Sequence, residues 1–155
     1  MEEAKRKIPQ EKKHVLGTRI LLVDDFVQWR FAVRSILEAV PGFRIIGEAS
    51  NGLEAIEKAA TLRPDIVLLD IGMPILNGIE AARRIRRVSP NSKMIFLTQE
   101  QDSDVRAAAL AVGADAYLLK STAVGDLRPA IDAALQRGFQ PHVPNLLPLT
   151  SSYGG

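Results

Sequence analysis

The chain of 155 residues has the composition of one globular domain, with 46% hydrophobic and 25% charged residues. It contains no cysteine, which excludes disulfide bonds, thiolate zinc sites and a cysteine nucleophile. Its apolar stretches are too short to cross a bilayer, and charges stand where a signal peptide needs its apolar segment. We therefore expect a cytoplasmic protein without membrane attachment.

The formal charge of +2 comes from the start of the chain. Residues 1–13 carry five basic and three acidic groups, whereas the remaining residues carry 15 of each sign. Such a composition is typical of a solvated segment, so we expect residues 1–17 to form a basic, flexible N-terminal arm. Because the body is neutral, we expect this chain itself to bind no nucleic acid.

Five strand-like and five helix-like segments alternate along residues 18–138. Four of the strand segments are apolar runs without alternation, which indicates strands covered on both faces of a parallel sheet. The segment 43–50 is more polar, as an edge strand can be. In chain order the segments are strand 20–23, helix 27–40, strand 43–50, helix 52–62, strand 66–69, helix 78–88, strand 94–97, helix 104–114, strand 117–119 and helix 124–137.

The last and the first helical segments carry more detailed signals. Ser121 or Thr122 can cap the helix 124–137, and we expect Pro129 in or near its first turn, where a missing N–H costs least. In the helix 27–40, the apolar residues that fall near one face, and that we expect to be buried, are Val27, Phe31, Ile36, Leu37 and Val40.

The alternation of strands and helices predicts an α/β fold, a doubly wound five-stranded parallel sheet with helices on both faces and right-handed crossovers. A strand order of 2-1-3-4-5, the flavodoxin-like order, places the polar second strand at an edge. In such sheets ligands bind beyond the carboxyl ends of the strands, where the order reverses between strands 1 and 3. A functional site is therefore expected at that rim.

Charged and polar residues stand at the ends of four predicted strands. Asp24 and Asp25 follow strand 1, Asp70 follows strand 3, Thr98 ends strand 4 and Lys120 follows strand 5. Carboxylates packed together raise each other's pKa unless a cation lies among them, so the cluster predicts a divalent metal. Ligation by oxygen alone favours Mg²⁺. A phosphate then has partners in Thr98 and Lys120, and Asp70 can form an aspartyl phosphate.

These residues resemble the receiver domains of two-component response regulators over about residues 18–138. The resemblance rests on the acidic pair, on the D-x-x-M-P motif of residues 70–74 with Gly78 after it, on Thr98, and on the sequence YLLKS at residues 117–121. The local sequence around these motifs is similar to that of receivers in regulators that carry a helix-turn-helix DNA-binding module. The combination is specific because each motif stands, in order, at the end of a strand.

The resemblance implies that Asp70 accepts a phosphoryl group from a sensor histidine kinase. It implies that Asp25 and Asp70 bind Mg²⁺ directly, that Asp24 helps, and that the backbone carbonyl of Gly72 is a further ligand. Phosphorylation and dephosphorylation are then self-catalysed, so we expect no enzyme acting on separate substrates.

The resemblance also assigns roles around the phosphate. Thr98 and Lys120 contact the phosphate oxygens, and Tyr117 turns inward as Thr98 moves, which alters a contact surface made by strand 4, helix 4 and strand 5. Gly72 and Glu100 stand at the two positions that orient or block the hydrolytic water in receivers. Because glycine offers no polar side chain, we expect a long-lived phosphorylated state.

Two interpretations of the whole chain remain open. Residues 139–155 form a Pro-rich C-terminal tail that cannot build a helical DNA-binding unit, so we expect no output domain. The chain is then either a single-domain receiver that acts on an unknown downstream protein target, or a receiver fragment of a DNA-binding transcriptional regulator. Whether it forms a homodimer is left open.

Two other classes fit less well. An aspartate-nucleophile phosphohydrolase of the haloacid-dehalogenase type places its two aspartates one residue apart after the first strand, whereas Asp24 and Asp25 are adjacent. A flavodoxin-like cofactor binder needs a phosphate loop of Gly, Ser and Thr after strand 1, where this chain has DDFVQWR.

Overall fold

The computed structural model describes residues 17–137. Within this range five strands form one parallel sheet in the order β2-β1-β3-β4-β5. The predicted fold class is confirmed, including the edge position of the more polar second strand. The strands are β1 (Thr18–Val23), β2 (Phe43–Ala49), β3 (Ile66–Leu69), β4 (Lys93–Thr98) and β5 (Ala116–Leu119).

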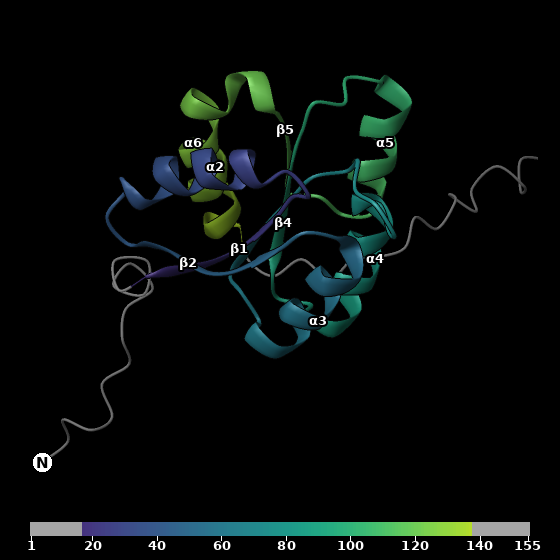
Figure 1. Cartoon of the computed structure of the whole chain (residues 1–155), viewed down its shortest axis with the longest axis horizontal. Helices are drawn as coiled ribbons and strands as arrows, with labels where there is room; N and C mark the ends of the chain where they lie inside the picture. The colour runs from purple at the N-terminus through teal and green to yellow at the C-terminus, as the bar shows by residue number, and fades with distance from the viewer. Residues whose placement is uncertain (1–16, 138–155) are drawn as a thin grey trace, which may run out of the picture.

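Helices cover both faces of the sheet (Figure 1). On one face lie α2 and α6, and on the other lie α3, α4 and α5. A short 3-10 turn at Lys120–Thr122 follows β5 and leads into α6. The helices are α2 (Val27–Glu38), α3 (Gly52–Leu62), α4 (Gly78–Val88), α5 (Ser103–Ala111) and α6 (Ala123–Gln136).

The central strands are buried on both faces, which explains why they read as continuous apolar runs. In β1, Ile20 and Leu22 pack with α2 and α6, while Leu21 and Val23 pack with the helices of the other face. All four side chains are at most 1% exposed. A strand without a solvent face has no position for a polar side chain until it leaves the sheet.

Side-chain caps fix three of the loops that leave the carboxyl ends of strands. Asn51 accepts the N–H of Glu54 at the start of α3, and Asn77 accepts the N–H of Glu80 at the start of α4. At the start of α5, Asp102 accepts the N–H groups of the next turn. These caps satisfy donors that no helical carbonyl can reach. They therefore hold the loops that surround the predicted site.

The buried face of α2 agrees with the predicted one only in part, since Leu37 is buried and Ile36 packs against the core as predicted. Val33 and Leu37 are buried against the sheet, whereas Val27 and Phe31 are 62% and 71% exposed. Val27 and Phe31 lie one turn apart and share a face that the sheet does not reach, so apolar spacing alone wrongly placed these two residues in the core. The helix also ends at Glu38 instead of Val40.

The start of α6 also differs from the prediction. Thr122 stands at the cap position, but its hydroxyl donates to the carbonyl of Leu119 and does not cap the helix. Pro129 lies inside the helix and not in its first turn. Both Pro129 and Gly125, whose carbonyl lacks the usual donor, are exposed, so water can replace the missing bond.

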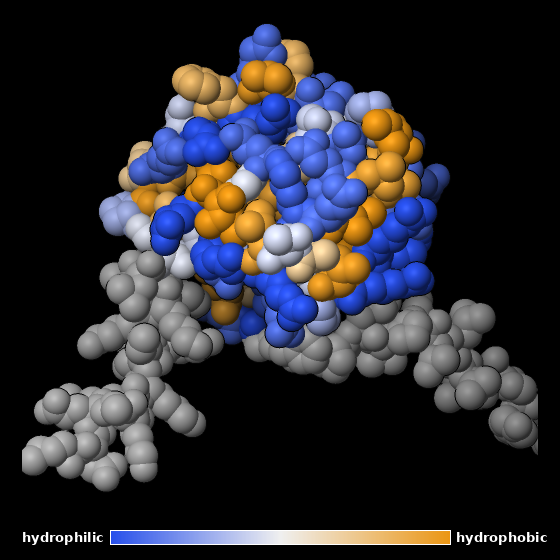
Figure 2. Space-filling model, turned by 60° about the horizontal axis from the view of Figure 1, so that its bottom comes forward, coloured by the Kyte–Doolittle hydropathy of each residue, from blue (hydrophilic) through white to orange (hydrophobic). Residues whose placement is uncertain are grey.

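Hydrophobic and hydrophilic side chains are interspersed on the surface. Figure 2 shows hydrophobic groups separated by hydrophilic ones over the face in view. Among residues 17–137, no helix is long and apolar enough to span a membrane. The predicted arm, apart from Gly17, and the predicted tail at residues 139–155 lie outside the described residues.

Candidate functional site

The predicted rim residues meet at the carboxyl ends of the strands. Val23 of β1 pairs with Leu69 of β3, so Asp24 and Asp70 leave the sheet side by side. Lys120 follows β5, and its ammonium reaches the carboxylates of both aspartates. Parallel strands deliver their last residues to one edge, which is why residues far apart in sequence are brought together.

Three carboxylates form the centre of the rim. Asp24, Asp25 and Asp70 each offer an oxygen atom, and these atoms lie within 4.8 Å of one another. Asp24 and Asp70 are buried, at 2% and 8% exposure, whereas Asp25 is exposed. Within residues 17–137, Asp25 has no hydrogen bond or ion pair. An oxygen-only cluster of this size, with one carboxylate unengaged, is typical of a Mg²⁺ site.

Lys120 is the counter-ion of the two buried carboxylates. Its Nζ lies 2.6 Å from Oδ2 of Asp24 and 3.1 Å from Oδ2 of Asp70, and its side chain is 8% exposed. The other oxygens accept backbone N–H groups, from Phe26 to Asp24 at 2.9 Å and from Ile71 to Asp70 at 2.7 Å. The sequence predicted Lys120 as a phosphate partner and gave no indication of its ion pair with Asp24.

The three clustered carboxylates carry more negative charge than the ammonium of Lys120 neutralises. Burial raises the pKa of the Asp24 carboxyl, while the hydrogen bonds from Lys120 and from the N–H of Phe26 lower it. The neighbouring carboxylate of Asp70 adds to the rise. A divalent cation would oppose both causes of the rise, so the residues present fit such an ion.

Two residues at the start of α2 support the rim. The ammonium of Lys120 lies 5.2 Å from the centre of the Trp29 ring, within cation–π range. Arg30 donates to the backbone carbonyl of Asp24 and, at 3.1 Å, to the carboxylate of Glu48 on β2. Neither contact was predicted from the sequence. Its only signal was that Trp29 and Arg30 lie in the helical segment that directly follows Asp24 and Asp25.

Thr98 and Tyr117 are joined through the backbone of Glu100. The buried Oγ1 of Thr98 accepts the N–H of Glu100 at 3.2 Å, and the Tyr117 hydroxyl donates to its carbonyl at 2.7 Å. Burial, with the nearby charge of Glu100, raises the pKa of Tyr117. Beside Thr98 a hollow of about 520 Å³ opens, lined by Trp29, Thr98, Gln99, Gln101, Leu119, Lys120 and Ser121.

The two glycines of the motif after Asp70 differ in their surroundings. A Cβ on Gly78 would lie 1.9 Å from the carbonyl oxygen of Asp70, so only glycine allows α4 to begin against this residue. Its N–H donates to the carbonyl of Ile71 at 2.8 Å, which closes the loop. A Cβ on the exposed Gly72 would meet nothing within 4 Å. Gly78 is thus a packing requirement, while Gly72 leaves open space beside Asp70.

The sequence profile of the family described as the response regulator receiver domain matches residues 20–132. The chain belongs to this family. The match covers the sheet except Thr18 and Arg19 of β1, and most of α6, and it includes each rim residue described above.

Individual relatives agree with this assignment. The receiver domain is 40% identical over 116 residues to the transcriptional regulatory protein LiaR of Bacillus subtilis, covering 75% of this chain and 55% of that protein. The response regulator domain of Thermotoga maritima CheB has a TM-score of 0.74 and 31% identity, covering 79% of this chain and 98% of that one. The CheX–CheY–BeF3–Mg²⁺ complex of Borrelia burgdorferi has a TM-score of 0.72 and 26% identity, covering 77% and 90%.

The relatives differ from this chain in length. The chain spans 55% of LiaR and 53% of the nitrate/nitrite response regulator protein NarL of Escherichia coli, to which it is 37% identical over 74% of its own length. The receiver domain therefore corresponds to about half of these regulators.

Proposed function

We propose that Asp70 of this receiver domain accepts a phosphoryl group from a sensor histidine kinase. The observation that carries the proposal is the cluster of three carboxylates with Lys120 beside Asp70. Phosphoryl transfer depends mainly on positioning and on neutralising charge, and this rim provides a nucleophilic oxygen, a fixed ammonium and space for a cation.

Magnesium is the cation that the site would hold. Asp25 and Asp70 would bind it directly with the backbone carbonyl of Gly72, and Asp24 would assist. Support comes from the unengaged carboxylate of Asp25 and from the related CheY, which is complexed with Mg²⁺. When bound, the ion neutralises the charge that builds up on the phosphoryl oxygens.

The positions of the side chains support the following transfer step. A carboxylate oxygen of Asp70 attacks the phosphorus of a phosphohistidine; the new P–O bond forms as the P–N bond breaks, and the histidine nitrogen leaves with the bonding electron pair. Lys120, already 3.1 Å from Asp70, then pairs with a phosphoryl oxygen. Another phosphoryl oxygen accepts the hydroxyl of Thr98, which lines the same hollow as Lys120.

The signal would leave the site through the backbone of Glu100. When the Thr98 hydroxyl turns to the phosphate it releases the Glu100 N–H, and the loop that also holds the Tyr117 hydroxyl is free to move. Tyr117 then turns inward, which changes the surface of β4, α5 and β5. A phosphate of roughly −1.5 to −2 charge is sufficient for a loop shift of this kind. The recipient is a downstream protein target that contacts this surface.

A second candidate is the receiver part of a DNA-binding transcriptional regulator. It is favoured by relatives such as LiaR, of which the chain spans 55%. Both candidates use the same chemistry at Asp70, and in neither does the chain turn over a separate substrate. They differ in whether phosphorylation acts on another protein or on a DNA-binding module attached to the receiver.

The phosphoacceptor is tested by incubating the protein with acetyl phosphate and Mg²⁺ and measuring intact mass. We expect one phosphoryl group to be gained, and Asp70→Asn to abolish the gain while leaving the circular dichroism spectrum unchanged. Asp132→Asn, an exposed carboxylate on α6, serves as the control and should still be labelled. Normal labelling of Asp70→Asn would contradict the assignment, and steady release of phosphate from added phosphate esters would instead support a phosphohydrolase.

A further inference from the structure

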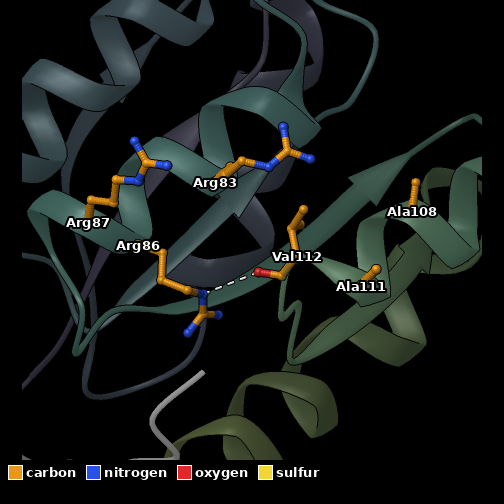
Figure 3. Close-up of a pocket in the computed structure, with 6 residues that line it drawn as sticks. All are labelled: Arg83, Arg86, Arg87, Ala108, Ala111 and Val112. Carbon is orange, nitrogen blue, oxygen red and sulfur yellow. Dashed lines mark hydrogen bonds between the residues drawn. The ribbon is translucent and has the colours of Figure 1, made fainter. Parts of the chain in front are cut away.

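A second hollow lies between α4 and α5, on a part of α4 that does not touch the rim. It measures about 580 Å³, within the size range of binding clefts, about 300–1,000 Å³. α4 meets Asp70 at Gly78, and the hollow begins five residues later, roughly 8 Å along the helix axis. Figure 3 shows its lining residues, which are Arg83, Arg86 and Arg87 of α4, with Ala108 and Ala111 of α5 and Val112 after it.

Arg86 fixes the two helices to each other. Its guanidinium donates to the carbonyl of Val112 at 3.2 Å (Figure 3). It also donates to the carbonyl of Gly113, and both carbonyls lie at the C-terminal end of α5. The positive charge also balances the partial negative charge of that helix end. Arg86 therefore has a structural role, because its hydrogen bonds hold one wall of the hollow in place.

Arg83 and Arg87 supply positive charge that α4 neutralises only in part. They are exposed and one turn apart, and Figure 3 shows their side chains spread along the helix instead of converging. Glu80 pairs with Arg83 and also with Arg84, so its one carboxylate serves two guanidinium groups. Within residues 17–137, the guanidinium of Arg87 has no hydrogen bond or ion pair.

The opposite wall of the hollow is apolar and unusually exposed. Ala109 is the only residue that α5 buries, while Ala108 and Ala111 face the hollow and are exposed. Further out on the same helix, Leu110 is 47% exposed. Small side chains allow the backbone of another helix to approach closely, at the short end of the usual interaxial distances of about 8–10 Å.

We propose that this groove binds an acidic amphipathic helix of a protein partner. Its apolar stripe would cover the alanines of α5, and carboxylates one turn apart would pair with Arg83 and Arg87. Guanidinium groups favour carboxylates because two parallel N–H bonds can form. A small anion would satisfy the arginines but leave the apolar wall in water, and the spread of the guanidinium groups suits an extended partner. The inference is independent of phosphorylation at Asp70.

The test is a selection of binders from a phage-displayed library of helical peptides, panned against the full chain. We expect enriched peptides to carry Asp or Glu at positions i and i+4 beside an apolar stripe. The double variant Arg83→Gln/Arg87→Gln should weaken their binding, measured by fluorescence anisotropy, roughly tenfold. Raising the salt concentration should weaken binding to the unchanged protein in the same direction.

A control of equal charge separates the groove from general electrostatics. Arg84→Gln/Arg128→Gln removes two positive charges outside the hollow and should change affinity less than about twofold. Ala111→Glu should weaken binding while every arginine is kept, because its carboxylate would occupy the groove. The proposal is overturned if no peptide is enriched, if the selected peptides bind the first double variant normally, or if both double variants weaken binding equally.

Discussion

At the rim of the sheet, two buried carboxylates share one ammonium while a third carboxylate faces solvent. Asp24 and Asp70 each use one oxygen for a backbone N–H and the other for Lys120. The rim is thus held in place before any ligand arrives, since its hydrogen bonds come from loops that the sheet fixes. Asp25 is therefore the carboxylate that we expect to take up the proposed cation.

A substitution at Gly78 tests whether the close approach of α4 to the backbone of Asp70 is required. Gly78→Ala would place a methyl group 1.9 Å from the Asp70 carbonyl oxygen, so the backbone must shift. We expect a loss of about 2–4 kcal/mol in unfolding free energy, from urea denaturation, together with slower labelling by acetyl phosphate.

The control for Gly78→Ala is Gly125→Ala in α6, where a Cβ meets nothing within 4 Å. It should be neutral or stabilise by about 0.5–1 kcal/mol, since alanine favours helix more than glycine does. If Gly78→Ala were as stable as this control and were labelled at the normal rate, the close approach to Asp70 would not matter.

Gly72 bears on the lifetime of the phosphorylated state. Hydrolysis needs a water in line with the phosphorus, and a residue with no polar side chain cannot hold it. The carboxylate of Glu100, the other residue predicted to orient this water, already accepts the N–H of Asp102 at 3.1 Å. We therefore expect slow dephosphorylation, and Gly72→Asn, which has open space for its side chain, should shorten the lifetime several-fold.

The lifetime is measured as loss of the phosphoryl mass after acetyl phosphate is removed. Gly72→Ala is the matched variant, because it adds a Cβ without a polar group. If the phosphorylated form of Gly72→Asn lasted as long as that of Gly72→Ala, or longer, the lack of an amide at position 72 would not be what slows hydrolysis.

Among the elements, α2 is tied to the edge strand β2 by a charged network. Glu48 of β2 bonds Arg30 at 3.1 Å and Arg34 at 2.6 Å, and Arg30 in turn holds the Asp24 carbonyl. Burial raises the pKa of the Glu48 carboxyl, but the hydrogen bonds from the two arginines outweigh it and lower the pKa below the usual 4.5. The edge strand is therefore linked to the rim through one carboxylate.

The lowered pKa of Glu48 predicts a pH dependence of stability. A carboxyl of this kind stabilises the fold above its unfolded pKa, and the contribution is lost as the pH falls through the lowered folded value. We expect Glu48→Gln to reduce unfolding free energy by about 1 kcal/mol at neutral pH, because the groups are a third exposed or less. The difference from the unchanged protein should fade below pH 4.5.

Urea denaturation at a series of pH values measures this difference. Glu38→Gln, which removes only the exposed partner of Arg34, is the control and should have a smaller effect at every pH. A constant difference between Glu48→Gln and the unchanged protein across the acid range would contradict the assigned cause.

At the scale of the whole molecule, folding assembles the proposed metal site from the ends of two strands that are distant in sequence. A cation that binds only the folded state must stabilise it, and Mg²⁺ at ten times its dissociation constant adds about 1.4 kcal/mol. We expect a rise of about 3–6 °C in melting temperature, followed by circular dichroism.

Asp25→Ala should abolish this rise, because among the three clustered carboxylates only that of Asp25 lacks a hydrogen bond or ion pair within the described residues. Asp104→Asn, an exposed carboxyl in the first turn of α5, is the control and should keep it. No change in either stability or Trp29 fluorescence at millimolar Mg²⁺ would exclude the site.

The sequence by itself determined the sheet and the composition of its rim. Strands buried on both faces must be apolar throughout, so Ile66–Leu69 and its counterparts were visible as unbroken runs that end where the chain meets water. Asp24, Asp70, Thr98 and Lys120 stand at those ends, and parallel strands bring such residues to one edge. Local chemistry and periodicity were sufficient for these features.

Only the tertiary structure decided which faces and partners were used. The burial of Val33 instead of Phe31 depends on how α2 lies over the sheet, and the ion pair of Lys120 with Asp24 joins residues 96 positions apart. The groove of Arg83 and Arg87 exists because α4 and α5 lie on the same face of the sheet and line one hollow. Each of these features depends on distances between separate elements, which a linear pattern of residue types does not contain.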